Sequence, residues 1–153
     1  MARLEKLPAG MAEHLLKVPC PQFEEPSFVH GPALAERRVA IVSTAGLHLR
    51  GDRPFTSLAA DYRVIPGDVS AGDLLMSHIS INYDRSGFQQ DWNVVFPLDR
   101  LHALAQRSQI GSVADFHYSF MGAVDAASLE PTAADVAGLL ARDRVDAALL
   151  VPV

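Results

Sequence analysis

The last third of the chain carries the pattern that most restricts the fold. Residues 131–142 ("PTAADVAGLLAR") begin with Pro131 in the first helical turn and repeat apolar side chains on one helical face. This predicted helix joins a predicted strand at 115–121 to a buried, Val/Leu/Ala-rich strand at 145–151. A strand–helix–strand connection of this length places its strands parallel in one sheet, with a right-handed crossover.

Earlier segments predict further elements of the same fold. Residues 39–44 ("VAIVST") form the β-branched run of a strand covered on both faces, and 61–68 indicate a short strand before a turn. The alternation of apolar and polar residues at 77–83 predicts another strand, and the spacing after a capping aspartate predicts a helix over 98–108. We therefore expect an α/β fold with a mostly parallel, Rossmann-like or flavodoxin-like sheet and flanking helices.

The N-terminal segment differs from the rest of the chain. Residues 1–37 contain five prolines and one short amphipathic stretch, which predicts a helix near 11–18 followed by an extended strap. Residues 38–153 show no repeat, no low-complexity tract and no internal boundary. We expect this proline-rich strap to lie on a single α/β domain.

Composition excludes several classes of function. The net charge of −5 and the pI near 5.6 argue against a nucleic-acid partner. No apolar run approaches the ~20 residues that a membrane-spanning helix needs, so no membrane association is expected. Cys20 is the single cysteine, which excludes an internal disulfide and favours a cytoplasmic location.

The segment 78–99 is the densest in residues that carry chemistry, although the chain has no motif with a complete mechanism. His78 and Asn82 share one face of the predicted strand, and Asp84 follows at its exit. Because a carboxylate can orient an imidazole and raise its pKa, His78 and Asp84 are candidates for acid–base chemistry. A hydrogen-bonded strand histidine and a turn-capping aspartate would give the same pattern.

A second polar segment, "DFHYSFMG", lies on the predicted strand at 115–121. Alternation places His117 and Ser119 on one face, and Tyr118 and Phe120 on the other. His78 and His117 have no third ligand near them in sequence, so we expect no metal site.

Five sequence blocks occur in one order: "HISINYD", "DWNVVFPLDRL", "IGSVADFHYSFMG", "PTAADVAGLL" and "VDAALLVPV". Together they make residues 36–153 resemble the selenoprotein B family of glycine, sarcosine, betaine and D-proline reductases, and most of all the D-proline reductase type. Five ordered blocks are far more specific than any single motif in the chain.

The resemblance implies a site at the ends of the strands. In that family the strand similar to "VDAALLVPV" is followed by selenocysteine, or cysteine in some members, and the selenolate is the nucleophile that cleaves a C–N bond reductively. We expect the catalytic residues to include His78 and Asp84. The residues expected to bind substrate are Asn82, Tyr83, His117, Tyr118 and Ser119.

The same resemblance sets expectations for cofactors and partners. The redox residue is expected directly after Val153, so the present chain is expected to hold no cofactor and to be inactive alone. Because UGA encodes selenocysteine, we expect that codon next, followed by a continuing reading frame. The implied partners are a small-molecule substrate, such as an amino acid or an N-substituted glycine, and a thiol or dithiol reductant.

Two other interpretations remain open. The chain is either a naturally short binding or protein-interaction module without catalysis, or a generic α/β enzyme that uses His78 and Asp84. The genomic bases after Val153 separate the family interpretation from the interaction module. An uncovered sheet edge would also favour a homodimer, unless the N-terminal strap covers it.

Overall fold

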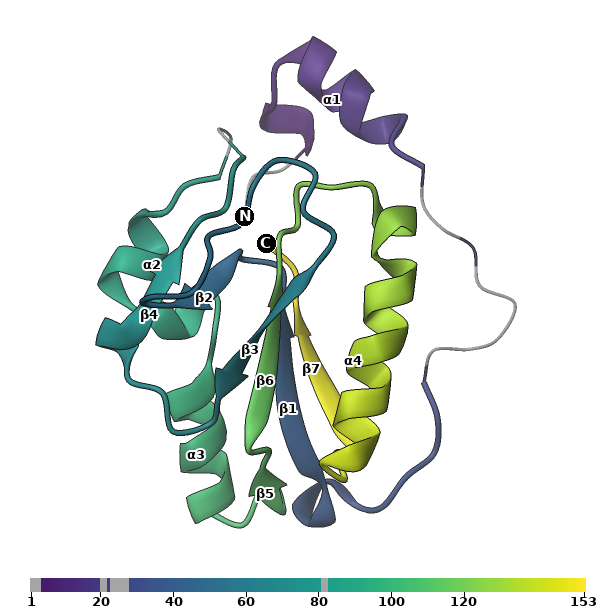
Figure 1. Cartoon of the computed structure of the whole chain (residues 1–153). Helices are drawn as coiled ribbons and strands as arrows, with labels where there is room; N and C mark the ends of the chain where they lie inside the picture. The colour runs from purple at the N-terminus through teal and green to yellow at the C-terminus, as the bar shows by residue number, and fades with distance from the viewer. Residues whose placement is uncertain (1–3, 20–21, 23–27, 81–82) are drawn as a thin grey trace.

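The computed structural model describes residues 4–19, 22, 28–80 and 83–153 as a mixed α/β protein (Figure 1). The strands of its main sheet are β1 (Arg38–Ser43), β3 (Tyr62–Pro66), β5 (Ser112–Val113), β6 (Phe116–Phe120) and β7 (Ala147–Val151). β1 runs parallel to β5, β6 and β7. β3 pairs antiparallel with β6. The α/β class is confirmed, whereas the sheet is mixed rather than uniformly parallel.

Apolar side chains on both faces of β1 explain its central position. Val39, Ala40 and Ile41 are all buried, as expected for a strand between two layers. The helix α3 (Leu98–Gln106) packs on one face of the sheet, and α4 (Glu130–Arg142) packs on the other (Figure 1). The predicted flanking helices are therefore confirmed.

The connection from β6 through α4 to β7 matches the predicted strand–helix–strand unit in its order. The predicted burial of the last strand is wrong, because no residue of β7 is buried and Leu150 is 68% exposed at the sheet edge. β7 pairs in parallel with β1 over five consecutive positions, from Val39 with Ala147 to Ser43 with Val151. β1 thus lies between β6 and β7, and the carboxyl ends of all three strands lie at one edge of the sheet. This edge is where ligands bind in open α/β sheets.

The strand predicted at 77–83 is wrong. The observed strand β4 (Leu74–Met76) ends earlier and pairs antiparallel with β2 (Leu47–Leu49) in a separate two-stranded sheet. Residues 77–80 have no regular structure, and 81–82 lie outside the described residues. Local hydrogen bonds replace a strand ladder here: Ser77 N–H donates to the Gly46 carbonyl, and Ser80 N–H donates to the His78 ring.

Shorter elements complete the described chain. They are η1 (Leu4–Lys6), α1 (Ala9–Leu16), η2 (Leu34–Glu36), η3 (Ala71–Asp73), α2 (Ser86–Gln90), η4 (Trp92–Val94) and η5 (Ala126–Leu129). The helix predicted near 11–18 is confirmed as α1, which buries none of its residues and stands apart from the sheet (Figure 1). Among the described residues, no helix has the length and apolar character required to cross a membrane.

Candidate functional site

The loop that follows β1 joins the ends of β6 and β7. Thr44 N–H donates to the carbonyl of Val151 at 3.1 Å, and the carbonyl of Thr44 accepts from Gly122 N–H at 2.9 Å. Two residues later, Gly46 N–H donates to the Phe120 carbonyl at 2.9 Å. These bonds fix the strand ends relative to one another, so side chains at this edge have defined positions.

Gly46 is required by its surroundings rather than being an ordinary turn glycine. Its φ of +66° lies in the left-handed region, and an added Cβ would stand 2.9 Å from the backbone nitrogen of His78. The absent side chain lets the segment that carries His78 pack directly on the exit of β1. Residues 77–80 are thereby held at the strand ends, although they do not belong to the sheet.

A cavity of about 300 Å³ opens at this edge, and we call it the strand-end cavity. Its lining consists of His78, Ser80, Tyr83, Gly122, Ala123 and Val153. The structure therefore brings two predicted site residues, His78 and Tyr83, to the same cavity as Val153. They come from an irregular segment, whereas Val153 directly extends the parallel sheet.

The imidazole of His78 has one ring nitrogen bonded and one free. Its Nδ1 lies 3.2 Å from the N–H of Ser80, which must donate, so the proton of the neutral ring is on Nε2. Nε2 is buried and has no hydrogen-bond partner among the described residues. Burial lowers the pKa of His78, and the nearby Arg85 guanidinium lowers it further. At neutral pH the His78 ring is therefore uncharged, and its buried Nε2–H has no acceptor among the described residues.

Tyr83 adds a second neutral donor. Its ring centroid lies 5.1 Å from that of His78 at a tilted angle of 57°. Burial raises the pKa of the Tyr83 phenol, an effect that Arg85 partly offsets. The guanidinium of Arg85 is held in place because it donates to the backbone carbonyl of His78. Two neutral donors near one cation form an environment suited to an anionic group.

Asp84 makes a local backbone contact in its own turn. The exposed carboxylate of Asp84 accepts the N–H of Ser86 at 2.9 Å, and this bond lowers the pKa of Asp84. Asp84 therefore bonds to the first residue of α2 within a local turn, and the His78 ring is held instead by the bond between its Nδ1 and Ser80. Asn82 lies outside the described residues.

His117, Tyr118 and Ser119 lie in the core, away from the cavity lining. His117 Nδ1 accepts the N–H of Ile41 at 2.9 Å, and burial lowers its pKa to about 4. Ser119 Oγ accepts the N–H of Leu47 at 2.8 Å. Tyr118 packs with Val136 on the other face of the sheet, as the alternation predicts. These residues precede the strand end, so their side chains fill the two interior layers.

Thr44 and Gly122 belong to this edge but were missed by sequence reasoning. Thr44 Oγ1 accepts the N–H of Val153 at 2.8 Å. A Cβ added to Gly122 would lie 2.9 Å from Thr44 Cβ, so the close approach of the two segments needs a glycine. The available signal was the sequence Thr44–Ala45–Gly46 directly after a buried strand, which marks a strand exit but not its contacts.

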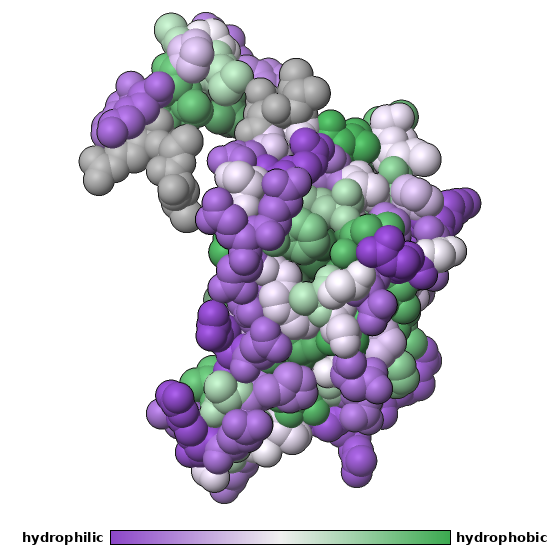
Figure 2. Space-filling model, turned by 90° about the vertical axis from the view of Figure 1, so that its left-hand side faces the viewer, coloured by the Kyte–Doolittle hydropathy of each residue, from purple (hydrophilic) through white to green (hydrophobic). Residues whose placement is uncertain are grey.

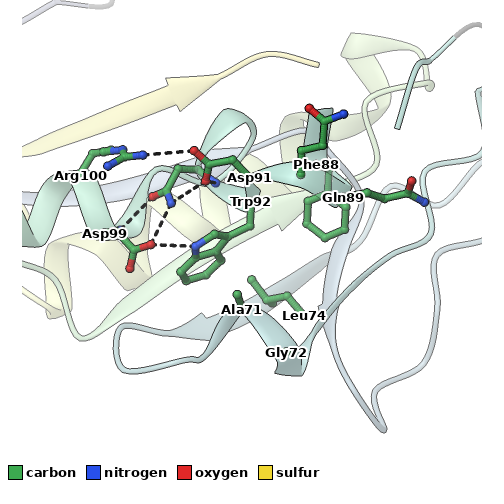
Figure 3. A pocket seen from close by; sticks show the side chains of 11 residues that line it. Ala71, Gly72, Leu74, Phe88, Gln89, Asp91, Trp92, Asp99 and Arg100 are labelled. Carbon is green, nitrogen blue, oxygen red and sulfur yellow. Dashed lines mark hydrogen bonds and ion pairs between the residues drawn. The ribbon is translucent and has the colours of Figure 1, made fainter. Parts of the chain in front are cut away.

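A larger cavity, of about 680 Å³, lies between η3, α2, η4 and the start of α3, and we call it the α2–α3 hollow. On the face that carries these helices, the surface shows hydrophobic side chains between polar ones (Figure 2). Close by, Arg100 points at Asp91 and Trp92 points at Asp99, whereas the Gln89 amide points away from them (Figure 3). Trp92 Nε1 and Asn93 Nδ2 both donate to Asp99, and Arg100 donates to Asp91.

The hollow is therefore built by helix-capping contacts. Asp91 accepts the N–H of Asn93 at the start of η4, and Asn93 Oδ1 accepts the N–H of Asp99 in the first turn of α3. The side-chain N–H groups of Trp92 and Asn93 are thus used within the protein. The strand-end cavity is the stronger candidate for chemistry, because it joins Val153 to His78, whose Nε2 has no partner in the part of the chain that the structure describes.

Comparison with known proteins gives one family and one relative. The profile of the family described as glycine/sarcosine/betaine reductase selenoprotein B (GRDB) matches residues 17–153. The D-proline reductase subunit gamma of Acetoanaerobium sticklandii is 37% identical over 121 residues, which cover 76% of this chain and 49% of the relative. The chain thus spans about half the length of that relative.

No solved structure matches the chain. The profile match includes every element of the main sheet, α3, α4 and all residues of the strand-end cavity. The resemblance found in the ordered sequence blocks is therefore confirmed. The chain belongs to the glycine/sarcosine/betaine reductase selenoprotein B family.

Proposed function

We propose that this chain forms the N-terminal part of a selenoprotein B-type reductase and that its strand-end cavity is the reaction site. The observation that carries the proposal is that Val153 and His78 line one cavity at the carboxyl ends of parallel strands. A residue joined to Val153 would emerge at this cavity, where Rossmann-like sheets bind their ligands. When present there, a selenolate would supply the nucleophile for reductive cleavage of a C–N bond.

The residues of the cavity suggest a division of roles. His78 would donate its Nε2–H to a ligand that reaches this buried atom, because Nδ1 is bonded to Ser80 and burial disfavours the charged ring. Tyr83 places a neutral phenol beside it, and the charge of Arg85 favours a ligand with a carboxylate. Asp84 and Asn82 belong to the same sequence segment and remain predicted site residues.

His117, Tyr118 and Ser119 support the site from the interior. The hydrogen bonds of His117 and Ser119 to Ile41 and Leu47 hold the backbone on either side of the β1 exit. A direct contact with substrate would require these buried side chains to leave the core. We therefore favour a supporting role over the predicted substrate-binding role for these residues.

The substrates in the names of the family and of the relative are glycine, sarcosine, betaine and D-proline. We propose that this protein acts on one small carboxylate of this amino-acid type, with a thiol or dithiol as electron donor. The volume of about 300 Å³ suits a ligand of that size.

A second candidate function is protein interaction, and the edge strand β7 favours it. Among the described residues, β7 pairs only with β1, and Leu150 on β7 is 68% exposed. An open strand edge with apolar side chains favours pairing with another polypeptide. The related protein is named as a subunit, which agrees with assembly. A homodimer or a complex with other subunits would both cover this edge.

The gene and its complete product test the proposed reductase. We expect a UGA codon directly after the codon for Val153 and an open frame beyond it. The full-length selenoprotein should consume one of the four substrates with dithiothreitol as reductant, whereas the 153-residue chain should show no turnover. A UAA or UAG codon, or equal activity of the short chain, would refute the proposal.

A further inference from the structure

Thr44 extends the contact between β1 and β7 beyond the end of their backbone pairing. The last paired residues are Ser43 and Val151, and Thr44 N–H then donates to the Val151 carbonyl at 3.1 Å. The N–H of Val153 bonds to a side chain instead of the backbone, because Thr44 Oγ1 accepts it at 2.8 Å. The same hydroxyl lies 3.4 Å from the Val153 carbonyl oxygen, to which it donates. One hydroxyl thus contacts both backbone polar groups of Val153.

The position of this hydroxyl is itself fixed. The carbonyl of Thr44 accepts the N–H of Gly122, and the Thr44 side chain packs against Gly122 where a Cβ would not fit. The next residue, Ala45, forms an isolated bridge with Met121. Thr44 is therefore held by the end of β6 while it holds the chain that leaves β7.

We infer that Thr44 is a positioning residue that directs the residue after Val153 into the strand-end cavity. The inference rests on the proposed function, since it concerns the reactive group expected at that place. Without the hydroxyl, Val153 loses the side-chain contact on both of its backbone groups, and the following residue is no longer aimed at His78. A reactive group would then spend less time near the donors and the positive charge that favour its ionised form.

Amide hydrogen exchange in the 153-residue chain tests whether the Thr44 hydroxyl protects the backbone N–H of Val153. Thr44→Val replaces the hydroxyl by a methyl group of the same shape, and Thr44→Ser keeps the hydroxyl. We expect the Val153 amide to exchange about tenfold faster in Thr44→Val, the factor of one lost hydrogen bond, and to stay protected in Thr44→Ser. Thr132→Val is the matched control, because Thr132 Oγ1 donates to the Ala60 carbonyl at 2.7 Å, away from this edge.

Thiol alkylation in the full-length protein tests the positioning. The expected selenocysteine codon is replaced by a cysteine codon, and the rate of reaction with iodoacetamide is measured against pH. In Thr44→Val we expect a rate about tenfold lower at neutral pH and an inflection moved toward that of an ordinary thiol, about 8.5. Thr44→Ser should restore the parent profile, and Thr132→Val should leave it unchanged.

The outcomes distinguish a failure of the role of Thr44 from a failure of the proposed reductase function. A reactive thiol in the parent with an unchanged profile in Thr44→Val would overturn the role of Thr44 and leave the reductase proposal standing. A thiol that is unreactive in the parent as well would overturn both. Equal losses in Thr44→Val and Thr132→Val would show a general loss of stability, which contradicts positioning.

Discussion

The two largest differences between the strand-end cavity and the α2–α3 hollow are in size and in hydrogen bonding. The hollow has about 680 Å³ and the strand-end cavity about 300 Å³. In the hollow, Trp92, Asn93 and Arg100 donate to Asp91 and Asp99, so these five side chains bond to one another. In the strand-end cavity, the buried Nε2–H of His78 has no partner among the described residues. The Nε2 of His117 in the core is also buried without a partner among the described residues, so the position of His78 beside Val153 is what favours the strand-end cavity.

Gly46 at the strand-end cavity is tightly packed, whereas Gly72 at the hollow is not. An added Cβ at Gly46 would contact the His78 backbone at 2.9 Å, whereas at Gly72, which lines the hollow, it would meet nothing within 4 Å. The strand-end cavity therefore depends on close backbone contacts, and the hollow does not. Substitutions at matched positions should separate the two regions.

The largest effect is expected from removal of the free donor of His78. In His78→Asn the side-chain oxygen can still accept the N–H of Ser80, but no group replaces Nε2–H. We expect kcat of the full-length reductase to fall about a hundredfold or more, the usual contribution of a preorganised hydrogen-bond donor. Asp91→Asn in the hollow should leave kcat within about twofold. Similar losses in both variants would remove the distinction between the regions.

The buried ring of His117 should make stability depend on pH. Its pKa is about 4 in the folded protein and 6.5 for the free side chain, so the unfolded chain takes up a proton first as the pH falls. The free energy of unfolding should therefore decrease between about pH 6.5 and pH 4, by roughly 3 kcal/mol from this group. Urea titrations at several pH values measure the decrease.

His117→Asn provides the control for this pH dependence. The asparagine oxygen can accept the N–H of Ile41 but does not titrate. The variant should lose stability at pH 7, because the edge contact of His117 with the Phe96 ring is lost, yet its stability should fall less steeply below pH 6.5. Parallel curves for the variant and the parent would show that His117 is not the responsible group.

Gly46→Ala should be destabilising, and Gly72→Ala should be nearly neutral. The φ of +66° and the contact with His78 at 2.9 Å together should cost about 2 kcal/mol at Gly46. At Gly72 the change should stay within about 0.5 kcal/mol. Thermal unfolding of the two variants measures the difference. A tolerated alanine at Gly46 would mean that residues 77–80 are not held against the β1 exit.

The smallest effect is expected from Trp92→Phe in the hollow. The variant keeps an aromatic ring near Phe96 but loses part of the indole's packing against the core and its N–H, which donates to Asp99 at 2.8 Å. We expect a loss of about 1 kcal/mol or less in the free energy of unfolding and no change in KM. A rise in KM would instead assign the substrate to the hollow.

Sequence reasoning predicted the central part of the fold because the spacing of apolar residues there fits only one kind of secondary structure. The run at 39–44 and the helix at 131–142 have patterns that fit one structure each, and β1 and α4 are found at those places. The strand at 77–83 failed because alternation over a few residues also arises in an irregular segment. There, bonds to Gly46 and Ser80 replace the ladder.

The site was predictable only in part for a related reason. His78 and Tyr83 were found from their residue types and from the resemblance, and they do meet Val153 at one cavity. Burial of His117 follows from its position before the strand end, which spacing alone does not reveal. Thr44 acts through a contact with a residue 109 positions away, so no local pattern marks it.

Inactivation by iodoacetamide tests the central claim most directly, with the modified residue located by peptide mass spectrometry. The full-length selenoprotein is treated at neutral pH with and without substrate, and Cys20 serves as an internal reference thiol. The account predicts that activity is lost as the residue directly after Val153 becomes alkylated, and that substrate slows this reaction while Cys20 reacts independently. Inactivation that follows Cys20, or that leaves the residue after Val153 unmodified, would contradict the account.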